Sequence, residues 1–195
     1  MVERETEKRA FDRVAWAYDT YMQRLGLYRE EKILELLELR GHEMIVDLCG
    51  GTGHLAERIG SRCKQITIVD YSKRMLSIAQ CRSGLHVVEG DASDTPFSDE
   101  EFDVALLTDS LHHVENQEGL VREAWRILRP CGRLLVHDFD RGQFFGKVEM
   151  LVERVLFRKV FFRKRVDIRA LLERNGFRIS KEVRGSGWFM LVGEK

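Results

Sequence analysis

The stretch Val46-Asp47-Leu48-Cys49-Gly50-Gly51-Thr52-Gly53-His54-Leu55-Ala56 decides the fold. An apolar run ends within it, three glycines follow within four positions, and a helical pattern begins directly after them. Glycines adopt positive φ and let a ligand approach the backbone, and the start of a helix offers unpaired N–H groups. The stretch therefore predicts a strand, a tight turn and a helix, with a ligand at the turn.

Apolar runs alternate with helical patterns on both sides of this turn. We expect strands at 44–49, 65–70, 85–89, 102–108 and 131–138, and helices at 53–60, 72–81, 116–128 and 167–175. Apolar strands separated by helices are typical of a parallel sheet covered on both faces. The segments 177–183 and 187–192 alternate around Arg184-Gly185-Ser186, which indicates an antiparallel hairpin. We predict an α/β fold: a Rossmann-like, doubly wound, mostly parallel seven-stranded sheet with an antiparallel C-terminal hairpin and helices on both faces.

The 195 residues are long enough for one substantial core, and no linker composition or internal repeat divides them. We expect a single domain with these parts: N-terminal helices (1–40, broken near Gly26), a cofactor-binding core (41–138), a basic amphipathic insertion or lid (139–169), and a C-terminal helix and hairpin (170–195). The net charge of +0 provides no global attraction to nucleic acid or membranes. Four scattered cysteines, a charged N-terminus and no apolar stretch of membrane-spanning length predict a cytoplasmic protein without a signal peptide.

A carboxylate follows the glycine turn at a meaningful distance. Asp70 ends the second predicted strand about 20 residues after the turn, where a carboxylate accepts hydrogen bonds from both ribose hydroxyls of a nucleoside. Asp91 follows the third strand and could accept the amino group of adenine, although a turn-forming role explains it equally well. Tyr71 and Met75 could pack on the purine faces. A turn without a ligand remains the alternative, and Asp70 makes it the weaker one.

The glycine pattern Gly51-x-Gly53-x-x-Ala56 also fits the fingerprint of nicotinamide dinucleotide enzymes. A short-chain dehydrogenase would need Tyr-x-x-x-Lys after the dinucleotide-binding half. The string Tyr28-Arg-Glu-Glu-Lys32 precedes the glycines and lies on the charged face of a predicted helix. We interpret that string as a coincidence.

Six features spread over nearly the whole chain resemble one known family: 11–19 (Phe-Asp-Arg-Val-Ala-Trp-Ala-Tyr-Asp), 47–53 (Asp-Leu-Cys-Gly-Gly-Thr-Gly), Asp70, Gly90-Asp91, Leu111-His112-His113 and 127–136 (Ile-Leu-Arg-Pro-Cys-Gly-Arg-Leu-Leu-Val). The chain is similar to class I S-adenosylmethionine-dependent methyltransferases, and within them to the ubiquinone/menaquinone-biosynthesis C-methyltransferase group. That group typically has Ala and Asp where this chain has Cys49 and His54. These two departures leave the expected cofactor intact.

The resemblance implies S-adenosylmethionine as cofactor and S-adenosylhomocysteine as product. It implies that the glycine turn lies along the methionine portion, Asp70 at the ribose, and Asp91 and Ala92 at the adenine. Tyr18 matches a tyrosine that can close over the cofactor, and a core aromatic is the equal alternative. The expected cofactor-binding residues are Tyr18, Asp47, Cys49, Gly50, Gly51, Gly53, Asp70, Tyr71, Met75, Asp91, Ala92, Thr108 and Asp109.

The acceptor side is expected at the carboxyl end of the fourth strand, where Thr108-Asp109-Ser110-Leu111-His112-His113 begins. His113 and His112 are the candidate catalytic residues, because either could remove an acceptor proton near neutral pH. A packed helix start for His112 and a loop hydrogen bond for His113 are the alternatives, and we favour His113 as facing the pocket. His137 and Asp138 could line the same site. No metal is expected, since adjacent histidines cannot both face one ion from a regular helix.

Two features bear on the class of acceptor. The sequence after the fourth strand lacks the Pro-Pro-aromatic signature of amino-methylating nucleic-acid enzymes. Pro130-Cys131 matches the nucleophile of cytosine C5 methylation, but it lies in the turn that enters the fifth strand, so we expect a structural cysteine. Nucleic acid is therefore disfavoured as a substrate.

The segment 141–169 concentrates basic residues among apolar ones. It could form a lid that admits an apolar or anionic acceptor, or it could rest on a lipid surface. The alternative that we favour is an insertion that packs its apolar stripe on the sheet and forms part of the acceptor lid.

These observations favour a methyltransferase that acts on a small-molecule acceptor at carbon or oxygen, with a quinone-like or lipid-like acceptor as one option. A non-catalytic S-adenosylmethionine-binding interaction protein and an RNA-modifying methyltransferase are the alternatives. Peripheral membrane contact and the oligomeric state stay open.

Overall fold

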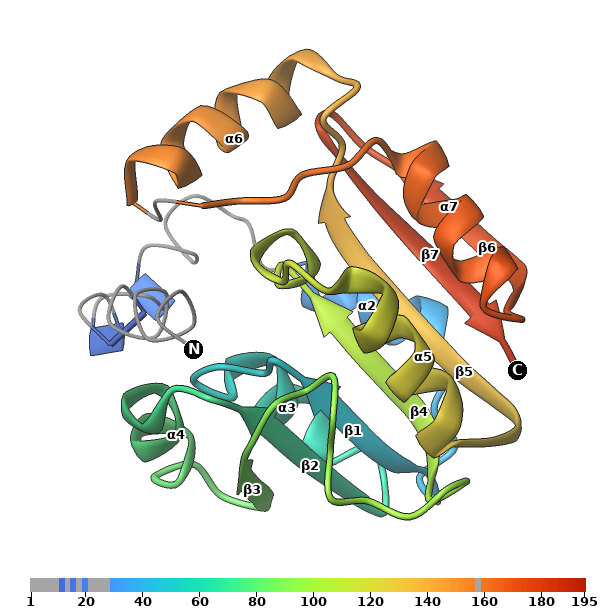
Figure 1. Cartoon of the computed structure of the whole chain (residues 1–195). Helices are drawn as coiled ribbons and strands as arrows, with labels where there is room; N and C mark the ends of the chain where they lie inside the picture. Colours follow the sequence, from blue (N-terminus) through green and yellow to red (C-terminus); the bar gives the residue numbers. More distant parts are fainter. Residues whose placement is uncertain (1–10, 13–14, 17–18, 21–28, 157–158) are drawn as a thin grey trace.

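The structure is a computed structural model that describes residues 11–12, 15–16, 19–20, 29–156 and 159–195. Its centre is a seven-stranded sheet with the order β3-β2-β1-β4-β5-β7-β6 (Figure 1). The strands are β1 (Met44–Leu48), β2 (Gln65–Asp70), β3 (Leu85–Glu89), β4 (Phe102–Thr108), β5 (Leu128–Phe139), β6 (Arg178–Arg184) and β7 (Trp188–Glu194). The helices are α2 (Glu30–Leu37), α3 (His54–Gly60), α4 (Lys73–Ala79), the 3-10 helix η1 (Leu111–His113), α5 (Gln117–Ile127), α6 (Phe144–Leu156) and α7 (Arg165–Arg174).

The sheet confirms the predicted fold class. Strands β1 to β5 pair in parallel, whereas β7 is antiparallel to β5 and to β6. The strand order reverses between β1 and β4, which is where open α/β sheets place their ligands, outside the carboxyl ends of the strands.

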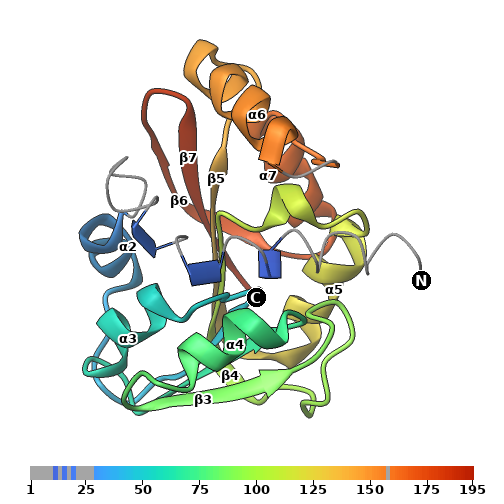
Figure 2. The same ribbon diagram turned by 90° about the vertical axis from the view of Figure 1, so that its left-hand side faces the viewer.

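The helices cover the two faces of the sheet separately (Figure 2). Side chains of α2, α3 and α4 form one buried cluster, and side chains of α5 and α7 form the other. In β1, Ile45 belongs to the first cluster, and Val46 and Leu48 belong to the second. Successive side chains of a strand point to opposite faces, so a strand covered on both sides is apolar at consecutive positions. This explains the continuous apolar runs in the sequence.

Strand β5 begins earlier than the sequence predicted. It begins at Leu128 and includes Pro130, whereas we expected the strand to begin at Cys131, directly after a turn. Its register against β4 shifts between Phe102 and Val104, and Cys131 has φ 67°. An irregular pairing of this kind tolerates residues that a regular strand excludes. The first of the two predicted N-terminal helices falls largely outside the described residues.

The insertion between β5 and α7 is closed by hydrogen bonds at its base. The backbone N–H of Arg141 donates to the carbonyl oxygen of Arg163 (3.3 Å), and that of Arg165 donates to Oδ1 of Asp140 (3.2 Å). Between these points α6 crosses the edge formed by the carboxyl ends of β4 and β5 (Figure 1).

The packing that we favoured for the insertion 141–169 is confirmed for Phe162, which is buried, and is wrong for four apolar side chains of α6. Phe144, Phe145, Leu151 and Val155 are exposed by 73%, 61%, 65% and 80%. The reason is the position of α6, which lies over the strand ends instead of on a face of the sheet (Figure 1). None of the described helices is long and apolar enough to cross a bilayer.

Candidate active site

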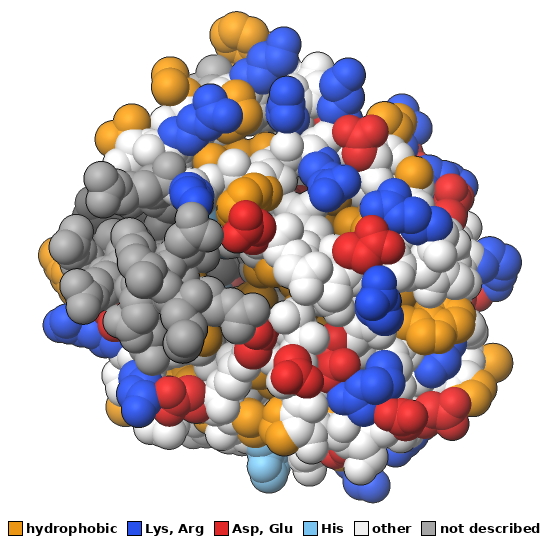
Figure 3. Space-filling model, viewed as in Figure 1, with side chains coloured by type: hydrophobic (Ala, Val, Ile, Leu, Met, Phe, Trp, Pro, Cys, Tyr) orange, Lys and Arg blue, Asp and Glu red, His pale blue; other side chains and the backbone are white. Residues whose placement is uncertain are grey.

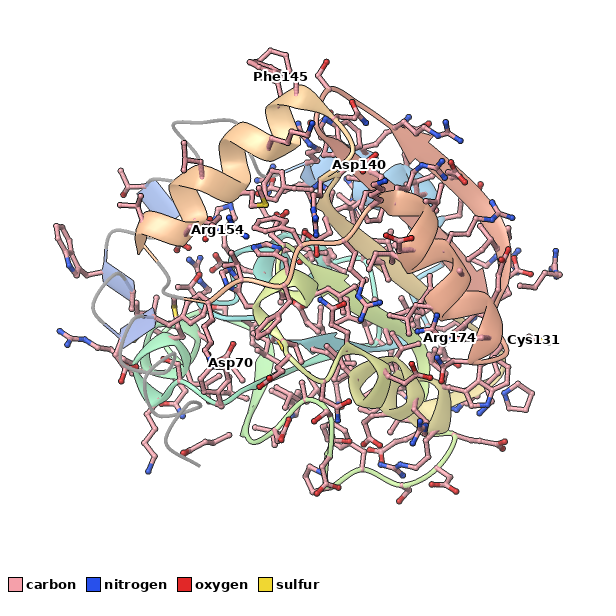
Figure 4. All side chains as sticks on the ribbon, turned by 45° about the horizontal axis from the view of Figure 1, so that its top comes forward. Asp70, Cys131, Asp140, Phe145, Arg154 and Arg174 are labelled. Carbon is pink, nitrogen blue, oxygen red and sulfur yellow. The ribbon has the colours of Figure 1, made fainter. Side chains whose placement is uncertain are left out.

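The glycine bend and the second strand meet through one carboxylate. The backbone N–H of Gly51 donates to Oδ2 of Asp70 (3.0 Å), and the backbone N–H of Ser72 donates to Oδ1 (2.8 Å). Burial raises the pKa of Asp70 to about 6, although these N–H donors act in the opposite direction. Figure 4 labels Asp70 at this edge of the sheet. The structure therefore brings together the two features on which the nucleoside site was predicted.

Two glycines of the bend have different roles. Both adopt left-handed backbone conformations, with φ 56° at Gly51 and 73° at Gly53. A Cβ atom at Gly51 would meet nothing within 4 Å, whereas a Cβ at Gly53 would lie 2.7 Å from Cδ1 of Ile68 and 2.9 Å from Cδ1 of Leu85. Gly51 thus borders open space, and Gly53 allows α3 to pack closely on the sheet. Cys49, just before them, has φ 61°.

Asp47 lies under the bend with a buried oxygen that lacks a partner. Its Oδ1 has no hydrogen-bond partner among the described residues, and a Cβ at Gly50 would meet its carboxylate at 2.8 Å. Burial, together with the nearby Asp70 carboxylate, raises the pKa of Asp47 to about 7. An unsatisfied carboxylate below an open backbone fits a ligand that carries hydrogen-bond donors or positive charge, as S-adenosylmethionine does.

The residues expected at the adenine follow β2 and β3 at the same edge. Met75 and Ala92 are buried, and Tyr71 is half-buried. Asp91 accepts hydrogen bonds from the backbone N–H (2.9 Å) and Oγ (2.8 Å) of Ser93. The turn role that we weighed for Asp91 is therefore present.

The N-terminal segment is tied to the bend by bonds that the sequence analysis missed. Oγ1 of Thr52 donates to Oδ1 of Asp19 (2.5 Å), Arg82 pairs with Oδ2 of Asp19 (2.5 Å), and Oγ of Ser72 donates to Oδ1 of Asp12 (2.6 Å). Both aspartates belong to the motif at 11–19, which was a usable signal. Tyr18, the residue that we selected from that motif, lies outside the described residues.

His112 is held by a carboxylate from the neighbouring strand. Its Nδ1 lies 2.6 Å from Oδ1 of Asp138, and its backbone N–H donates to Oδ2 (3.1 Å). Its ring stacks on Phe162 with centroids 4.3 Å apart, and its buried Nε2 has no hydrogen-bond partner in the part of the chain that the structure describes. Burial lowers the pKa of His112, but Asp138 and the more distant Glu153 and Asp109 outweigh it, so the pKa ends above the usual value. A base oriented in this way resembles the histidine–aspartate pair of many hydrolytic sites.

His113 has the opposite electrostatic environment. Burial and the neighbouring His112 hold the pKa of His113 well below the usual value, so the ring is neutral at pH 7. Its ring contacts Phe11 edge-on with centroids 4.9 Å apart, and its Nε2 lies 3.7 Å from Oε2 of Glu153 on α6. The sequence analysis missed Glu153, which is a rare acid within the basic insertion.

The rings of His112 and His113 lie close together, with centroids 4.1 Å apart. The two histidines lie in η1, which is a 3-10 helix and not a regular α-helix. One ligand atom from each of His112, His113 and Glu153 lies within 4.8 Å of the others. Adjacent histidines can therefore face one position here, and a metal ion is chemically compatible with the three groups.

Asp109 and His137 form a second pair at the ends of β4 and β5. The backbone N–H of Asp109 donates to the carbonyl oxygen of His137 (3.0 Å), and Oδ1 of Asp109 lies 3.2 Å from Nδ1 of His137. Asp109 has φ 49°, so the chain turns sharply after Thr108. The guanidinium of Arg29 lies over the ring of Trp188, 4.3 Å from its centroid. Burial lowers the pKa of Arg29, and the nearby Asp109 carboxylate offsets part of this shift. The sequence contained no signal for this contact between α2 and β7.

A comparison with known protein families fits this geometry, since residues 46–136 match the model of a methyltransferase domain. This part of the chain is similar to the methyltransferase-domain family. It spans β1 to most of β5 and includes the bend, Asp70, Asp91 and both histidines.

Curated relatives and solved structures agree with the family. The chain is 30% identical over 147 residues to the ubiquinone/menaquinone biosynthesis C-methyltransferase UbiE of Rubrivivax gelatinosus, which is 71% of this chain and 59% of that protein. It is 32% identical over 154 residues to the UbiE of Azotobacter vinelandii, covering 71% of this chain and 61% of that protein. A Thermotoga maritima structure described as an S-adenosylmethionine-dependent methyltransferase and possible histamine N-methyltransferase superposes with a TM-score of 0.80 at 24% identity, covering 96% of this chain and 99% of that one.

These matches have different weight. The chain spans about three fifths of the length of the curated relatives that it matches. The structural likeness is below one quarter identity and therefore concerns the fold. All three names describe methyltransferases, and the names differ in the acceptor.

Proposed function

We propose that the chain is an S-adenosylmethionine-dependent methyltransferase that acts on a small-molecule acceptor at carbon or oxygen. The observation that carries the proposal is the hydrogen bond between Gly51 and Asp70, because it joins the glycine bend to the carboxylate of the adjacent strand. A carboxylate at the end of that strand is suited to a ribose, and the open backbone at Gly51 is suited to the atoms attached to it. The methyltransferase-domain match over 46–136 supports the same activity.

The residues around the bend have separate roles in this proposal. Asp70 accepts hydrogen bonds from the ribose, and the backbone from Cys49 to Gly53 accommodates the methionine portion. Asp47 lies below the bend as an acceptor, together with Thr108 and Asp109 at the end of β4. The adenine lies among Tyr71, Met75, Asp91 and Ala92. When bound, the cofactor supplies an electrophilic methyl group on a sulfonium.

On the acceptor side, His112 accepts the proton of the acceptor, and His113 and Glu153 line the site. Asp138 orients the ring of His112 and stabilises the charged form that proton uptake creates. A neutral His113 adds a polar contact without placing positive charge against the sulfonium. The surrounding aromatic rings, Phe11, Phe139 and Phe162, keep water away from the displacement.

The aromatic surroundings favour an acceptor with an ionisable hydroxyl or enol on an apolar body. Phenols, hydroquinones and their lipid-like derivatives have this chemistry, and the names of the curated relatives favour quinone precursors among them. An acceptor of this class becomes nucleophilic at carbon or oxygen when it loses a proton to His112.

Calorimetry with S-adenosylmethionine and S-adenosylhomocysteine tests the cofactor assignment. Asp70→Ala should weaken binding roughly 10- to 100-fold, because a charge-assisted hydrogen bond to each ribose hydroxyl is lost. Glu89→Ala is the matched control, since Glu89 pairs with Asp70 in the register of β2 and β3 and its side chain is exposed. No heat with either compound, or unchanged affinity in Asp70→Ala, would contradict the proposal.

Methyl transfer from radiolabelled donor to a panel of phenols and hydroquinones tests the reaction itself. Turnover on at least one member is expected. Tight cofactor binding without turnover on any member would favour the non-catalytic alternative.

A further inference from the structure

Helix α6 is amphipathic, but its apolar side faces the solvent instead of the protein. Its exposed side carries the large apolar side chains, while Glu153 on its inner side is only 7% exposed. Leu151 and Val155 follow Phe144 by seven and eleven residues, so the helical repeat puts the three on one stripe. Soluble helices normally bury such a stripe, and a contiguous exposed one indicates a binding surface.

Basic side chains flank this stripe. Lys147 and Arg154 are exposed and lie three or four positions from the apolar residues, which places them beside the stripe. We call Phe144, Phe145, Lys147, Leu151, Arg154 and Val155 the α6 surface. Figure 3 shows apolar and basic side chains side by side along the upper edge of the molecule, over α6. Figure 4 shows Phe145 pointing outward from this edge and Arg154 near the other end of the helix.

We propose that the α6 surface docks on an anionic lipid bilayer. An interfacial helix inserts its apolar residues at the boundary between headgroups and acyl chains while its Lys and Arg side chains contact lipid phosphates. The charge pattern favours this occupant over a protein, because both flanking charges are positive and a uniformly negative surface complements them. The shape agrees, since α6 forms an outer edge of the molecule instead of a groove (Figure 1).

Docking in this orientation has a consequence for the acceptor side, which rests on the proposed function. The inner side of α6 places Glu153 at 3.7 Å from His113. One helix would therefore contact lipid on its outer side and the acceptor site on its inner side. An amphiphilic acceptor would have a short path from the bilayer to His112.

Co-sedimentation of the whole chain with extruded vesicles tests the proposal, without methyl donor or acceptor. Binding is expected to vesicles made of equal parts phosphatidylglycerol and phosphatidylcholine, and much weaker binding to phosphatidylcholine alone. Added salt should weaken the binding. A failure here leaves the methyltransferase proposal intact, because cofactor binding is measured separately.

Two double variants separate the apolar and electrostatic parts. Leu151→Ser with Val155→Ser, and Lys147→Glu with Arg154→Glu, should each reduce partitioning onto the anionic vesicles about tenfold or more. Val166→Ser controls for loss of an exposed apolar side chain, since Val166 on α7 is 51% exposed. Arg62→Glu with Lys64→Glu controls for the charge change, because both residues are exposed near the start of β2, at the opposite edge of the sheet. Cofactor affinity reports that each variant is folded.

Three outcomes would overturn the proposal: no sedimentation of the wild-type chain, equal binding to neutral and anionic vesicles, or wild-type binding by both α6 variants. Light scattering without lipid tests the competing explanation, which is that the α6 surface binds a second copy of the chain. A dimer that Leu151→Ser with Val155→Ser abolishes would assign the α6 surface to a second copy of the chain.

Discussion

The two halves of the carboxyl edge are held together by different means. At β1 and β2, the Asp70 carboxylate accepts hydrogen bonds from the backbone N–H of Gly51 in the glycine bend and from that of Ser72 at the start of α4, and all three residues lie close to the ends of predicted strands. At β4 and β5, the site depends on side chains from distant segments, with His112 bonded to Asp138 and facing Glu153 of the insertion. The Asp70 contacts of the first half are made by backbone N–H groups, whereas the His112 contacts of the second half depend on side chains from distant segments. The two halves should therefore fail differently when they are altered.

The largest effect is expected in the acceptor half. His112→Gln should lower the rate of methyl transfer about 100-fold or more, because the base is lost, while cofactor affinity stays at the wild-type value. Initial rates and calorimetry on the same preparation measure both. His86→Gln is the control, since His86 is exposed on β3. Asp138→Asn should also lower the rate and shift its pH profile. A parallel loss of cofactor affinity in His112→Gln would mean that the halves are not independent.

The next effect concerns the stability of the cofactor half. The pKa of Asp47 is raised to about 7 in the folded chain, so the folded state holds a proton that the unfolded state releases near pH 4. This group's contribution to stability is therefore lost as the pH rises from about 4 to 7. Asp47→Asn should remove that loss. At pH 8 the free energy of unfolding of the variant should therefore exceed that of the wild type by about 2 to 4 kcal/mol.

Urea unfolding of the wild type and Asp47→Asn at pH 5 and pH 8 measures this difference. The variant's advantage should be larger at pH 8. If the free energies of unfolding of the variant and the wild type differ by the same amount at both pH values, Asp47 is not the group that titrates between them.

The two glycines offer a sharper division within the cofactor half. Gly53→Ala should destabilise the fold by about 1 to 3 kcal/mol, because its Cβ would clash with Ile68 and Leu85 at a positive φ. Gly51→Ala should cost only about 1 kcal/mol of stability, since its Cβ meets open space, but should weaken cofactor binding severalfold. Thermal unfolding and calorimetry separate the two outcomes. The reverse pattern would place the ligand on the other side of the bend.

The smallest effect is the pH dependence of cofactor binding. Because the pKa of Asp70 is about 6, its carboxylate becomes protonated below that pH and loses acceptor capacity for the ribose. Affinity should fall by up to about tenfold per pH unit below 6 and level off above 7. Asp70→Asn should flatten this profile, and Glu89→Ala should keep it. A wild-type affinity that is constant from pH 5 to 8 would contradict the role of Asp70.

The sequence predicted the strands and the glycine bend of this first half because the rules that govern them are local. Strands at 65–70, 85–89 and 102–108 match the observed bounds, and the contact between Asp70 and the bend follows from two parallel strand ends meeting at one edge. Glycine spacing and strand periodicity are properties of short stretches of sequence, so these features can be predicted without knowing where distant segments lie.

The acceptor half was less accessible because its contacts depend on how the insertion crosses the edge. Both histidines were named as candidates, but the closeness of their rings, with centroids 4.1 Å apart, and their shared proximity to Glu153 depend on side-chain conformations that residue spacing does not predict. Glu153 was overlooked in a basic segment. The stripe of α6 was expected against the sheet, since periodicity tells which residues share a face but not which way the face points.

Two hydrogen bonds close the base of the insertion, between Arg141 and Arg163 and between Asp140 and Arg165. Because of them, the length of the insertion can change without changing the rest of the fold. Both ends leave the sheet region at one place, so residues can be added to or removed from the segment between them while the strand registers stay fixed, and the entropic cost of such changes grows slowly with loop length. Natural selection can therefore diversify this segment at little risk to donor binding. Descendants of one ancestral domain could in this way come to serve different metabolites while sharing a single source of methyl groups.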